Sequence, residues 1–147
     1  MPGRIDARGE AVHRNPVPTV DIIIEHEGGI VLVERRNPPF GWALPGGFID
    51  TGESAEEAAS REALEETGLE LAELRQFHVY SDPARDSRLH TITTVFTAVG
   101  RGALAAGDDA ASARVYHPAE LPAEVAFDHR AIIEDYASDR WARPPRH

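Results

Sequence analysis

The residues best suited to catalysis lie in one acidic stretch of the chain, between residues 47 and 69. This stretch holds seven acids and one base, so it carries a net charge of −6 out of −10 for the whole chain. The acids are Asp50, Glu53, Glu56, Glu57, Glu62, Glu65 and Glu66, and the base is Arg61. A run of charged residues is often only the solvated face of a helix. The spacing of the carboxylates therefore has to show whether this stretch is such a surface or a functional site.

The spacing places three carboxylates on one face of a helix predicted over residues 54–67. At about 100° per residue, Glu65 and Glu66 fall on either side of Glu62, within an arc of about 100°. No lysine interrupts them, so three like charges repel one another and lower the stability of the helix. A hard divalent cation such as Mg²⁺ prefers carboxylate oxygens and removes that repulsion. The pattern therefore predicts a metal site.

The residues around these carboxylates favour the same interpretation. Arg61 lies four residues from both Glu57 and Glu65, so we expect it to pair with them and orient the ligands. The carboxylate face also carries small side chains that allow close approach of other backbone, namely Ala55, Ala58 and Ala59. Gly46 and Gly47, before the helix, permit backbone geometry closed to other residues. They could present carbonyls to a metal and amides to phosphate.

These residues resemble the Nudix box, G-x5-E-x7-R-E-U-x-E-E-x-G-U, in which U is a bulky aliphatic residue. The matching positions are Gly47, Glu53, Arg61, Glu62, Glu65, Glu66, Gly68 and Leu69. The small Ala63 stands at the first U, a departure expected to loosen local packing. The resemblance implies an α/β fold, an α/β/α sandwich with a mixed β-sheet. It also implies metal-dependent hydrolysis of a nucleoside diphosphate linked to a moiety X.

The resemblance assigns roles within the box. It implies Mg²⁺ or Mn²⁺ bound by Glu62, Glu65, Glu66, Glu53 and the Gly47 carbonyl. Arg61 and Gly68 have structural roles in this scheme. A bound metal bridges pyrophosphate oxygens and lowers the pKa of the attacking water, whose proton a carboxylate then accepts. The identity of that base stays open: the candidates are Glu62 inside the box and Asp108, Asp109 and Glu120 on later loops.

A polar loop after the box indicates which X is bound. Residues 81–90 resemble the S-x-P-x-R-D-P-R-x-H segment of ADP-ribose pyrophosphatases, with Ser87 in place of the second proline. Arg85 and Arg88 are expected to bind phosphate or ribose oxygens. Asp86 is expected to hold one arginine in place or to accept ribose hydroxyls.

Aromatic residues near the glycines are candidates for the apolar slot that adenine needs. They are Trp42 and Phe48, with Phe40 and Tyr80 behind them. Residues 126–129 resemble an L-A-F-D-H segment of the same subgroup. There we expect capping and packing by Asp128 and Phe127 rather than catalysis.

The predicted function is hydrolysis of ADP-ribose to AMP and ribose 5-phosphate, and two alternatives stay open. The chain could be a Nudix pyrophosphatase for a nucleoside triphosphate, a dinucleoside polyphosphate or a nucleotide sugar. It could also be a Nudix domain that senses a nucleotide without hydrolysing it. The complete set of carboxylates in the box disfavours the sensor.

The hydrophobic pattern predicts the elements that position these residues. Strands are expected over residues 20–25, 30–34, 71–80, 90–99 and 113–116, the first two joined as a hairpin. The helix over residues 54–67 begins with a capping box of Ser54 and Glu57 and ends at Gly68. A second helix, capped by Asp128, is expected over residues 129–136. Residues 102–112 are predicted to be a flexible lid.

Length and composition set the remaining limits. The 147 residues fit one domain, predicted as an extended arm over 1–18, a Nudix hydrolase domain over 19–140 and a basic tail over 141–147. Without cysteine there is neither a disulfide scaffold nor a thiolate zinc site. The net charge of −10 disfavours nucleic-acid binding, and no apolar run could span a membrane. We expect a cytoplasmic protein with a small-molecule nucleotide substrate, and the arm is a candidate segment for forming a homodimer.

Overall fold

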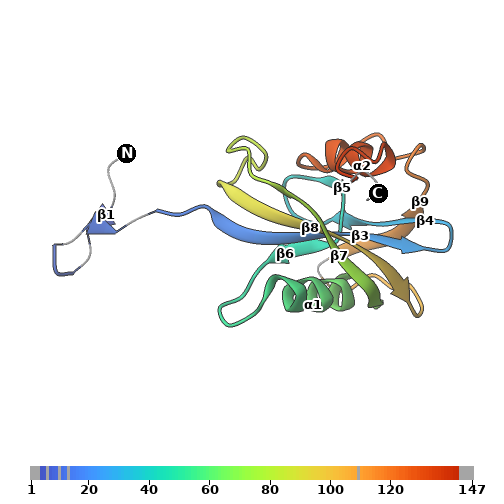
Figure 1. Cartoon of the computed structure of the whole chain (residues 1–147), viewed down its shortest axis with the longest axis horizontal. Helices are drawn as coiled ribbons and strands as arrows, with labels where there is room; N and C mark the ends of the chain where they lie inside the picture. The colour runs from blue at the N-terminus through green and yellow to red at the C-terminus, as the bar shows by residue number, and fades with distance from the viewer. Residues whose placement is uncertain (1–3, 6, 10, 13, 109, 143–147) are drawn as a thin grey trace, which may run out of the picture.

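A mixed β-sheet with one helix on each face forms the body of the computed structural model (Figure 1). The structure describes residues 4–5, 7–9, 11–12, 14–108 and 110–142. The strands are β1 Arg4–Ile5, β2 Ala11–Val12, β3 Val17–His26, β4 Gly29–Arg35, β5 Gly41–Ala43, β6 Gly46–Phe48, β7 Glu70–Tyr80, β8 Thr91–Arg101 and β9 Ala110–Tyr116. The helices are α1 Ala55–Thr67 and α2 His129–Ala137.

Strand β3 is the centre of the seven-stranded sheet. The main strand order is β5-β4-β3-β8-β7, with β6 paired to β3 and β9 to β4. Strands β3 and β8 run parallel and the other pairs are antiparallel, so the sheet is mixed as predicted. The first half of β3 pairs with β6 and its end pairs with β4. The predicted hairpin is confirmed, with Glu27 and Gly28 at positive φ in its turn.

Two apolar clusters fill the spaces between the sheet and its helices. On the α1 side, Ala58, Ala59 and Ala63 pack against Ile22 and Ile24 of β3. On the α2 side, a second cluster joins Ile132 and Ile133 of the helix to Ile23 and Val95 of the sheet. Side chains alternate between the faces of a strand, and β3 serves both clusters in this way. The α/β/α sandwich is therefore confirmed.

The ends of α1 match their sequence signals. Ser54 Oγ accepts a hydrogen bond from the Glu57 N–H, and Glu57 Oε1 accepts one from the Ser54 N–H, which completes the capping box. Gly68 ends the helix at φ 73°, where glycine carries little steric cost. The departure at Ala63 leaves a fully buried residue within the α1 cluster.

Other expectations shift in detail. Strand β3 begins at Val17, so two residues of the predicted arm belong to the sheet. Residues 143–147 of the predicted tail lie outside the described residues. The backbone N–H groups of Ala105 and Gly107 donate to carbonyls at the end of α1, so part of the predicted lid is fixed to the helix. Neither helix of the described chain has the length and apolar content needed to cross a membrane.

Candidate active site

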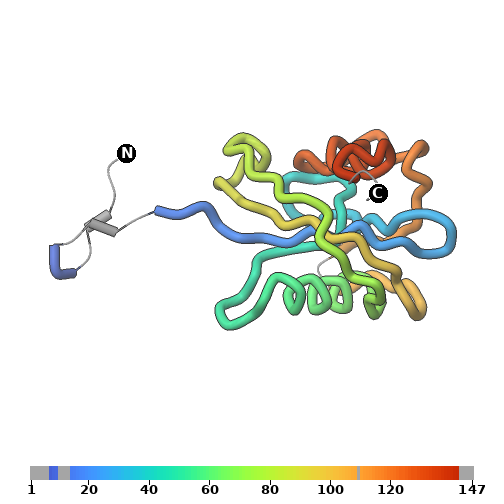
Figure 2. The backbone as a smooth tube through the Cα atoms, viewed as in Figure 1, coloured from blue at the N-terminus to red at the C-terminus, as the bar shows by residue number. Residues whose placement is uncertain are grey.

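A cavity of about 180 Å³ opens beside β3, between β6 and the loop over residues 81–90. Residues 81–90 lie on the α2 side of the sheet, at the end where β8 begins (Figure 2). Charged side chains of both signs line the cavity, namely Asp21, Glu66, Asp86, Arg35, Arg85 and Arg88. A cavity with cations and carboxylates in its walls suits a ligand that carries phosphate together with a metal ion.

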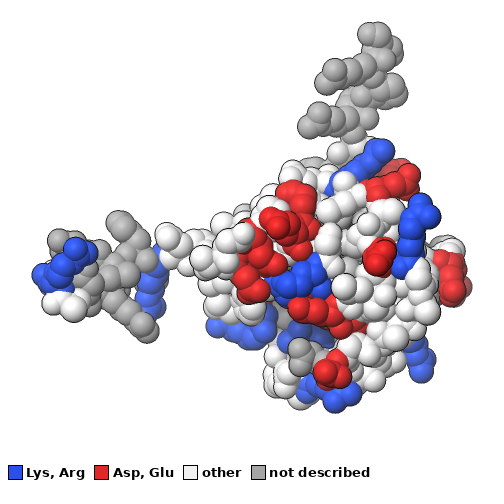
Figure 3. All heavy atoms as spheres, turned by 90° about the horizontal axis from the view of Figure 1, so that it is seen from below, with Lys and Arg blue, Asp and Glu red and all other residues white. Residues whose placement is uncertain are grey.

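Glu66 reaches this cavity from α1, and Glu62 lies beside it. Burial and the neighbouring Glu62 raise the pKa of Glu66 to about 9. Burial also raises the pKa of Glu62, although Arg61 acts in the opposite direction. Acidic side chains gather among basic ones on the α1 side of the molecule (Figure 3). Two neighbouring carboxyl groups whose charged forms are disfavoured mainly by burial are a fitting donor set for a divalent cation.

Gly47 packs directly against this carboxylate pair. A Cβ atom at Gly47 would lie 2.6 Å from Glu62 Oε1, so only glycine lets the backbone approach Glu62 this closely. The Gly46 N–H donates to Glu66 Oε2 at 3.4 Å. Within the described ranges, no three acids or histidines come together closely enough to hold a metal ion. Glu62, Glu66 and the backbone at Gly46 and Gly47 lie together there. Glu53 and Glu65 are joined to Glu62 through Arg61.

Arg61 orders the acids of the box, but not in the predicted pairing. Its Nε and Nη2 donate to the two carboxylate oxygens of Glu53 at 2.6 and 2.8 Å. Its Nη1 donates to Glu62 at 2.8 Å and to Glu65 at 3.3 Å. The bonds from Arg61 to Glu53, with a further one from the Asp50 N–H, lower the pKa of Glu53 to about 2. The predicted pair with Glu57 was wrong, because that carboxylate caps the helix instead.

Arg85 is buried rather than open to a ligand. Its side chain is 4% exposed, and its Nε and Nη2 donate to the Asp128 carboxylate at 3.0 and 2.7 Å. Its Nη1 donates to the hydroxyl of Thr91. The prediction that Arg85 binds substrate oxygens is therefore not supported by its geometry. Asp128 occupies the N-cap position of α2 as predicted, but its side chain makes no cap bond and pairs with Arg85 instead.

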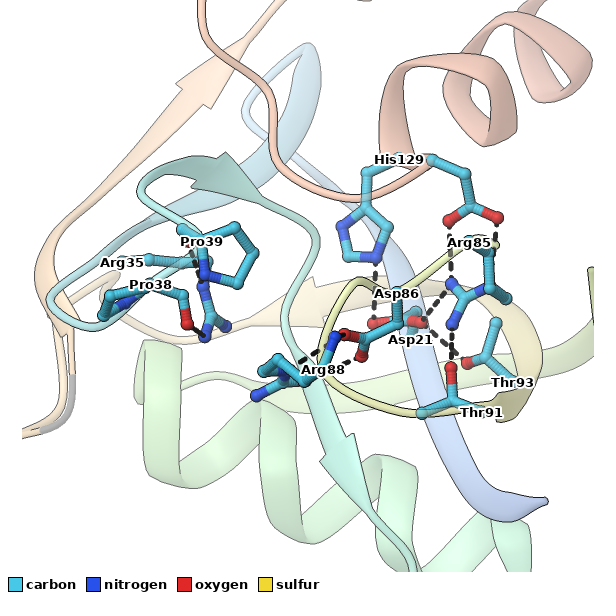
Figure 4. A network of polar contacts seen from close by, with 11 residues as sticks. Asp21, Arg35, Pro38, Pro39, Arg85, Asp86, Arg88, Thr91, Thr93 and His129 are labelled. Carbon is cyan, nitrogen blue, oxygen red and sulfur yellow. Dashed lines mark hydrogen bonds and ion pairs between the residues drawn. The ribbon is translucent and has the colours of Figure 1, made fainter. Parts of the chain in front are cut away.

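Asp21 and His129 complete this buried network. Sequence analysis did not single out Asp21, whereas His129 ends the segment over residues 126–129 that resembles the L-A-F-D-H motif. His129 Nδ1 accepts a hydrogen bond from the Leu44 N–H at 2.9 Å, so the ring proton sits on Nε2. That atom lies 3.4 Å from Asp21 Oδ1 (Figure 4). The other oxygen of Asp21 accepts a bond from Thr93 at 2.7 Å. An acid inside the apolar run from Val20 to Ile24 was the signal available in the sequence.

Arg88 is held by a carboxylate but remains at the cavity. Its Nε and Nη2 donate to the two oxygens of Asp86 at 3.0 and 2.8 Å, as the sequence suggested for one arginine of the loop. The pKa of Asp86 is lowered despite its burial, because Arg88 donates to it. Arg35 lines the same cavity and was missed, since one arginine at the end of a strand carries no distinctive pattern.

The aromatic residues predicted to bind adenine differ in where the structure places them. Phe48 lines the cavity, whereas Trp42 packs edge-on against Tyr116 and is not among the residues that line the cavity. Tyr80 donates to Asp135 of α2, and Phe40 is 62% exposed on the loop before β5. Phe48 is therefore the one predicted aromatic that the structure brings to the cavity, and Phe127 joins it.

The candidate bases on later loops are not brought to the cavity within the described residues. Asp108 is exposed in the turn before β9, and Glu120 is exposed before α2. Neither lines the cavity. Asp109 lies outside the described residues, so its candidacy stays a prediction.

Comparisons with known proteins agree with this geometry. A model of the NUDIX domain family matches residues 15–136. An ADP-ribose pyrophosphatase of Methanocaldococcus jannaschii is 45% identical over 139 residues, which cover 92% of this chain and 80% of that protein.

Two solved structures place the same fold beside nucleotides. The NUDIX domain of Shewanella oneidensis NrtR, complexed with ADP ribose, matches with a TM-score of 0.76 and 29% identity over 93% of this chain and 94% of that one. A bifunctional NMN adenylyltransferase/ADP ribose pyrophosphatase of Francisella tularensis, complexed with AMP and a Mn ion, matches with a TM-score of 0.75 and 27% identity. That match covers 88% of this chain and 43% of the longer one. Because the family match spans most of its length, the chain belongs to the Nudix family of pyrophosphohydrolases.

Proposed function

We propose that this protein hydrolyses ADP-ribose to AMP and ribose 5-phosphate, using Mg²⁺ or Mn²⁺. The observation that carries the proposal is the cavity itself, which has Glu66 of the acidic helix in one wall and Arg88 of the 81–90 loop in another. A diphosphate bound between them meets metal ligands on one side and a cation on the other. The similarity to an ADP-ribose pyrophosphatase over 92% of the chain supports this choice of substrate.

The residues of the Nudix box would act mainly by holding the metal ion and orienting its ligands. Glu62, Glu65 and Glu66 would bind the metal, helped by Glu53 and the Gly47 carbonyl. When bound, the metal supplies charge neutralisation at the pyrophosphate and a more acidic attacking water.

Arg61 fixes the carboxylates of the box through its bonds to Glu53, Glu62 and Glu65. A carboxylate then takes the proton of that water, and Glu62, Asp108 and Asp109 remain the candidates, with Glu120 behind them.

Partners and location remain expectations of the sequence. We propose a small-molecule nucleotide as the substrate, no nucleic-acid partner and a cytoplasmic location, with a homodimer formed through the N-terminal arm.

A substrate panel tests the proposed function directly. We expect ADP-ribose to give the highest kcat/KM with Mg²⁺ or Mn²⁺, and AMP and ribose 5-phosphate to be the two products. The panel should include nucleoside triphosphates, dinucleoside polyphosphates and nucleotide sugars, with products identified by chromatography. If any of these compounds gave a higher kcat/KM than ADP-ribose, that compound would be assigned as the substrate instead. Binding without turnover of any compound in the panel would instead favour a nucleotide sensor.

Thr19 offers a second test, because its hydroxyl is buried at the cavity without a hydrogen-bond partner among the described residues. A buried unsatisfied hydroxyl lowers stability by roughly 1–3 kcal/mol, unless a ligand satisfies it. Thr19→Val should therefore raise the free energy of unfolding by about 1 kcal/mol. It should also raise KM for ADP-ribose roughly three- to tenfold, since one hydrogen bond contributes about 0.5–1.5 kcal/mol.

Thr93→Val is the matched control, because the Thr93 hydroxyl already donates to Asp21. That variant should lower stability, since it leaves a buried carboxylate oxygen short of a donor. Chemical denaturation and steady-state kinetics give both readouts. A Thr19→Val protein that is less stable and keeps the wild-type KM would exclude a hydrogen bond from Thr19 to the substrate.

A further inference from the structure

Two arginines from distant parts of the chain converge on one aromatic ring. The guanidinium carbon of Arg35, at the end of β4, lies 4.8 Å from the centroid of the Phe127 ring. That of Arg88, in the loop before β8, lies 5.2 Å from the same centroid. All three residues line the cavity described above, and Figure 4 shows the two guanidinium groups near each other. Phe127 and Arg35 belong neither to the Nudix box nor to the 81–90 loop, so those two motifs do not explain why they lie at the cavity.

The two arginines are only partly satisfied by their neighbours. Arg88 uses Nε and Nη2 on Asp86. Arg35 donates to the carbonyls of Pro39 and Pro38, at 2.7 and 3.5 Å, and forms no ion pair with any carboxylate of the described chain. Burial, followed by the charge of Arg88, lowers the pKa of Arg35. Two cations that repel each other beside a cavity are suited to a ligand with more than one negative charge.

The backbone at Phe127 is unusual for a large side chain. Its φ is 58°, a left-handed conformation that bulky residues seldom adopt. Such a conformation persists only where the surroundings fix it, and it gathers at functional sites. Here the Ala126 N–H donates to the Trp42 carbonyl at 2.8 Å, and Asp128 is paired with Arg85. The residues on both sides are therefore anchored, so the ring is held where both guanidinium groups meet it.

We propose that Phe127 is a positioning residue that holds Arg35 and Arg88 as a pair to bind the diphosphate group of the substrate. The face of an aromatic ring attracts a guanidinium group, so one ring stabilises two cations that would otherwise move apart. The pair then contacts diphosphate oxygens that are not turned toward the acidic helix. This inference rests on the proposed function only for the class of substrate, a nucleoside diphosphate derivative.

Three substitutions separate the ring from the backbone turn. Phe127→Tyr keeps an aromatic face, Phe127→Leu keeps apolar bulk without one, and Phe127→Gly removes the side chain but suits the positive φ. Phe40→Leu is the matched control, because Phe40 is an exposed phenylalanine that does not line the cavity. Calorimetry with Mg²⁺ measures Kd for α,β-methylene-ADP, a diphosphate that resists hydrolysis, and for AMP, which has a single phosphate. Thermal unfolding of each variant reports on the fold.

We expect the leucine and glycine variants to raise Kd for α,β-methylene-ADP about tenfold or more, with a smaller effect on AMP. The tyrosine variant and the control should bind like the wild type. Tight binding by the glycine variant would show that only the turn matters, and equal losses for both ligands would show a general collapse of the nucleotide pocket. Either result overturns the proposal, as does a wild-type protein that fails to bind the analogue. A different best substrate in the panel would change the proposed function and leave this comparison intact.

Discussion

Glu66→Gln is expected to lower kcat for ADP-ribose about a thousandfold or more while the fold survives. A metal ion contributes several kcal/mol of charge stabilisation in the transition state, and each 1.36 kcal/mol is about a factor of ten in rate. Glu66 is the box carboxylate that lines the cavity, so its loss should remove most of that contribution. Its pKa of about 9 shows that its charge is already disfavoured without a metal. The uncharged glutamine side chain should therefore leave the stability of the metal-free protein unchanged or increase it.

Two measurements on the same protein check this prediction. Steady-state kinetics at saturating Mg²⁺ gives kcat, and thermal unfolding in EDTA gives metal-free stability. Glu56→Gln is the matched control, because Glu56 is an exposed acid in the first turn of the same helix. A Glu66→Gln protein with a kcat near that of the control would show that Glu66 is not a metal ligand.

The parts of the site that sequence predicted are those set by local rules. The capping box of Ser54 and Glu57 and the stop at Gly68 fix the position of α1 within a few residues. The 3.6-residue period then places Glu62 and Glu66 together. The alternation of β3 likewise follows from strand geometry. None of these features depends on how distant segments meet.

The parts that sequence missed depend on contacts between distant segments. Arg85 and Asp128 are 43 residues apart, and each was given a role that its own neighbours suggested. Trp42 lies close to the glycines in sequence, yet its ring packs against Tyr116. Asp21 looks misplaced in an apolar strand until His129 and Thr93 are brought beside it by the fold. The local sequence pattern cannot predict which distant residues pair, because the pairing depends on which face of the sheet each segment covers.

The buried pair of Arg85 and Asp128 leads to the second large effect, on stability rather than turnover. Arg85→Ala should lower the free energy of unfolding by about 3–5 kcal/mol, the usual cost of leaving one partner of a buried ion pair alone. The Arg85 side chain is 4% exposed and that of Asp128 is 23% exposed, so solvent screens part of the loss and the lower end of this range is expected. The substitution also leaves Asp21, 3.7 Å from the same guanidinium group, with one fewer cation. Chemical denaturation monitored by circular dichroism measures the change.

Two further variants show whether the ion pair itself is the cause. Arg140→Ala removes an arginine whose side chain is 60% exposed and pairs with Asp135 at 3.2 Å, so it should change stability by no more than about 1 kcal/mol. Arg85→Leu combined with Asp128→Leu removes both charges and should recover most of the lost stability, because apolar side chains often replace a buried ion pair without cost. If Arg85→Ala and Arg140→Ala instead lowered stability equally, the burial of the pair of Arg85 and Asp128 would not be the cause of its contribution to stability.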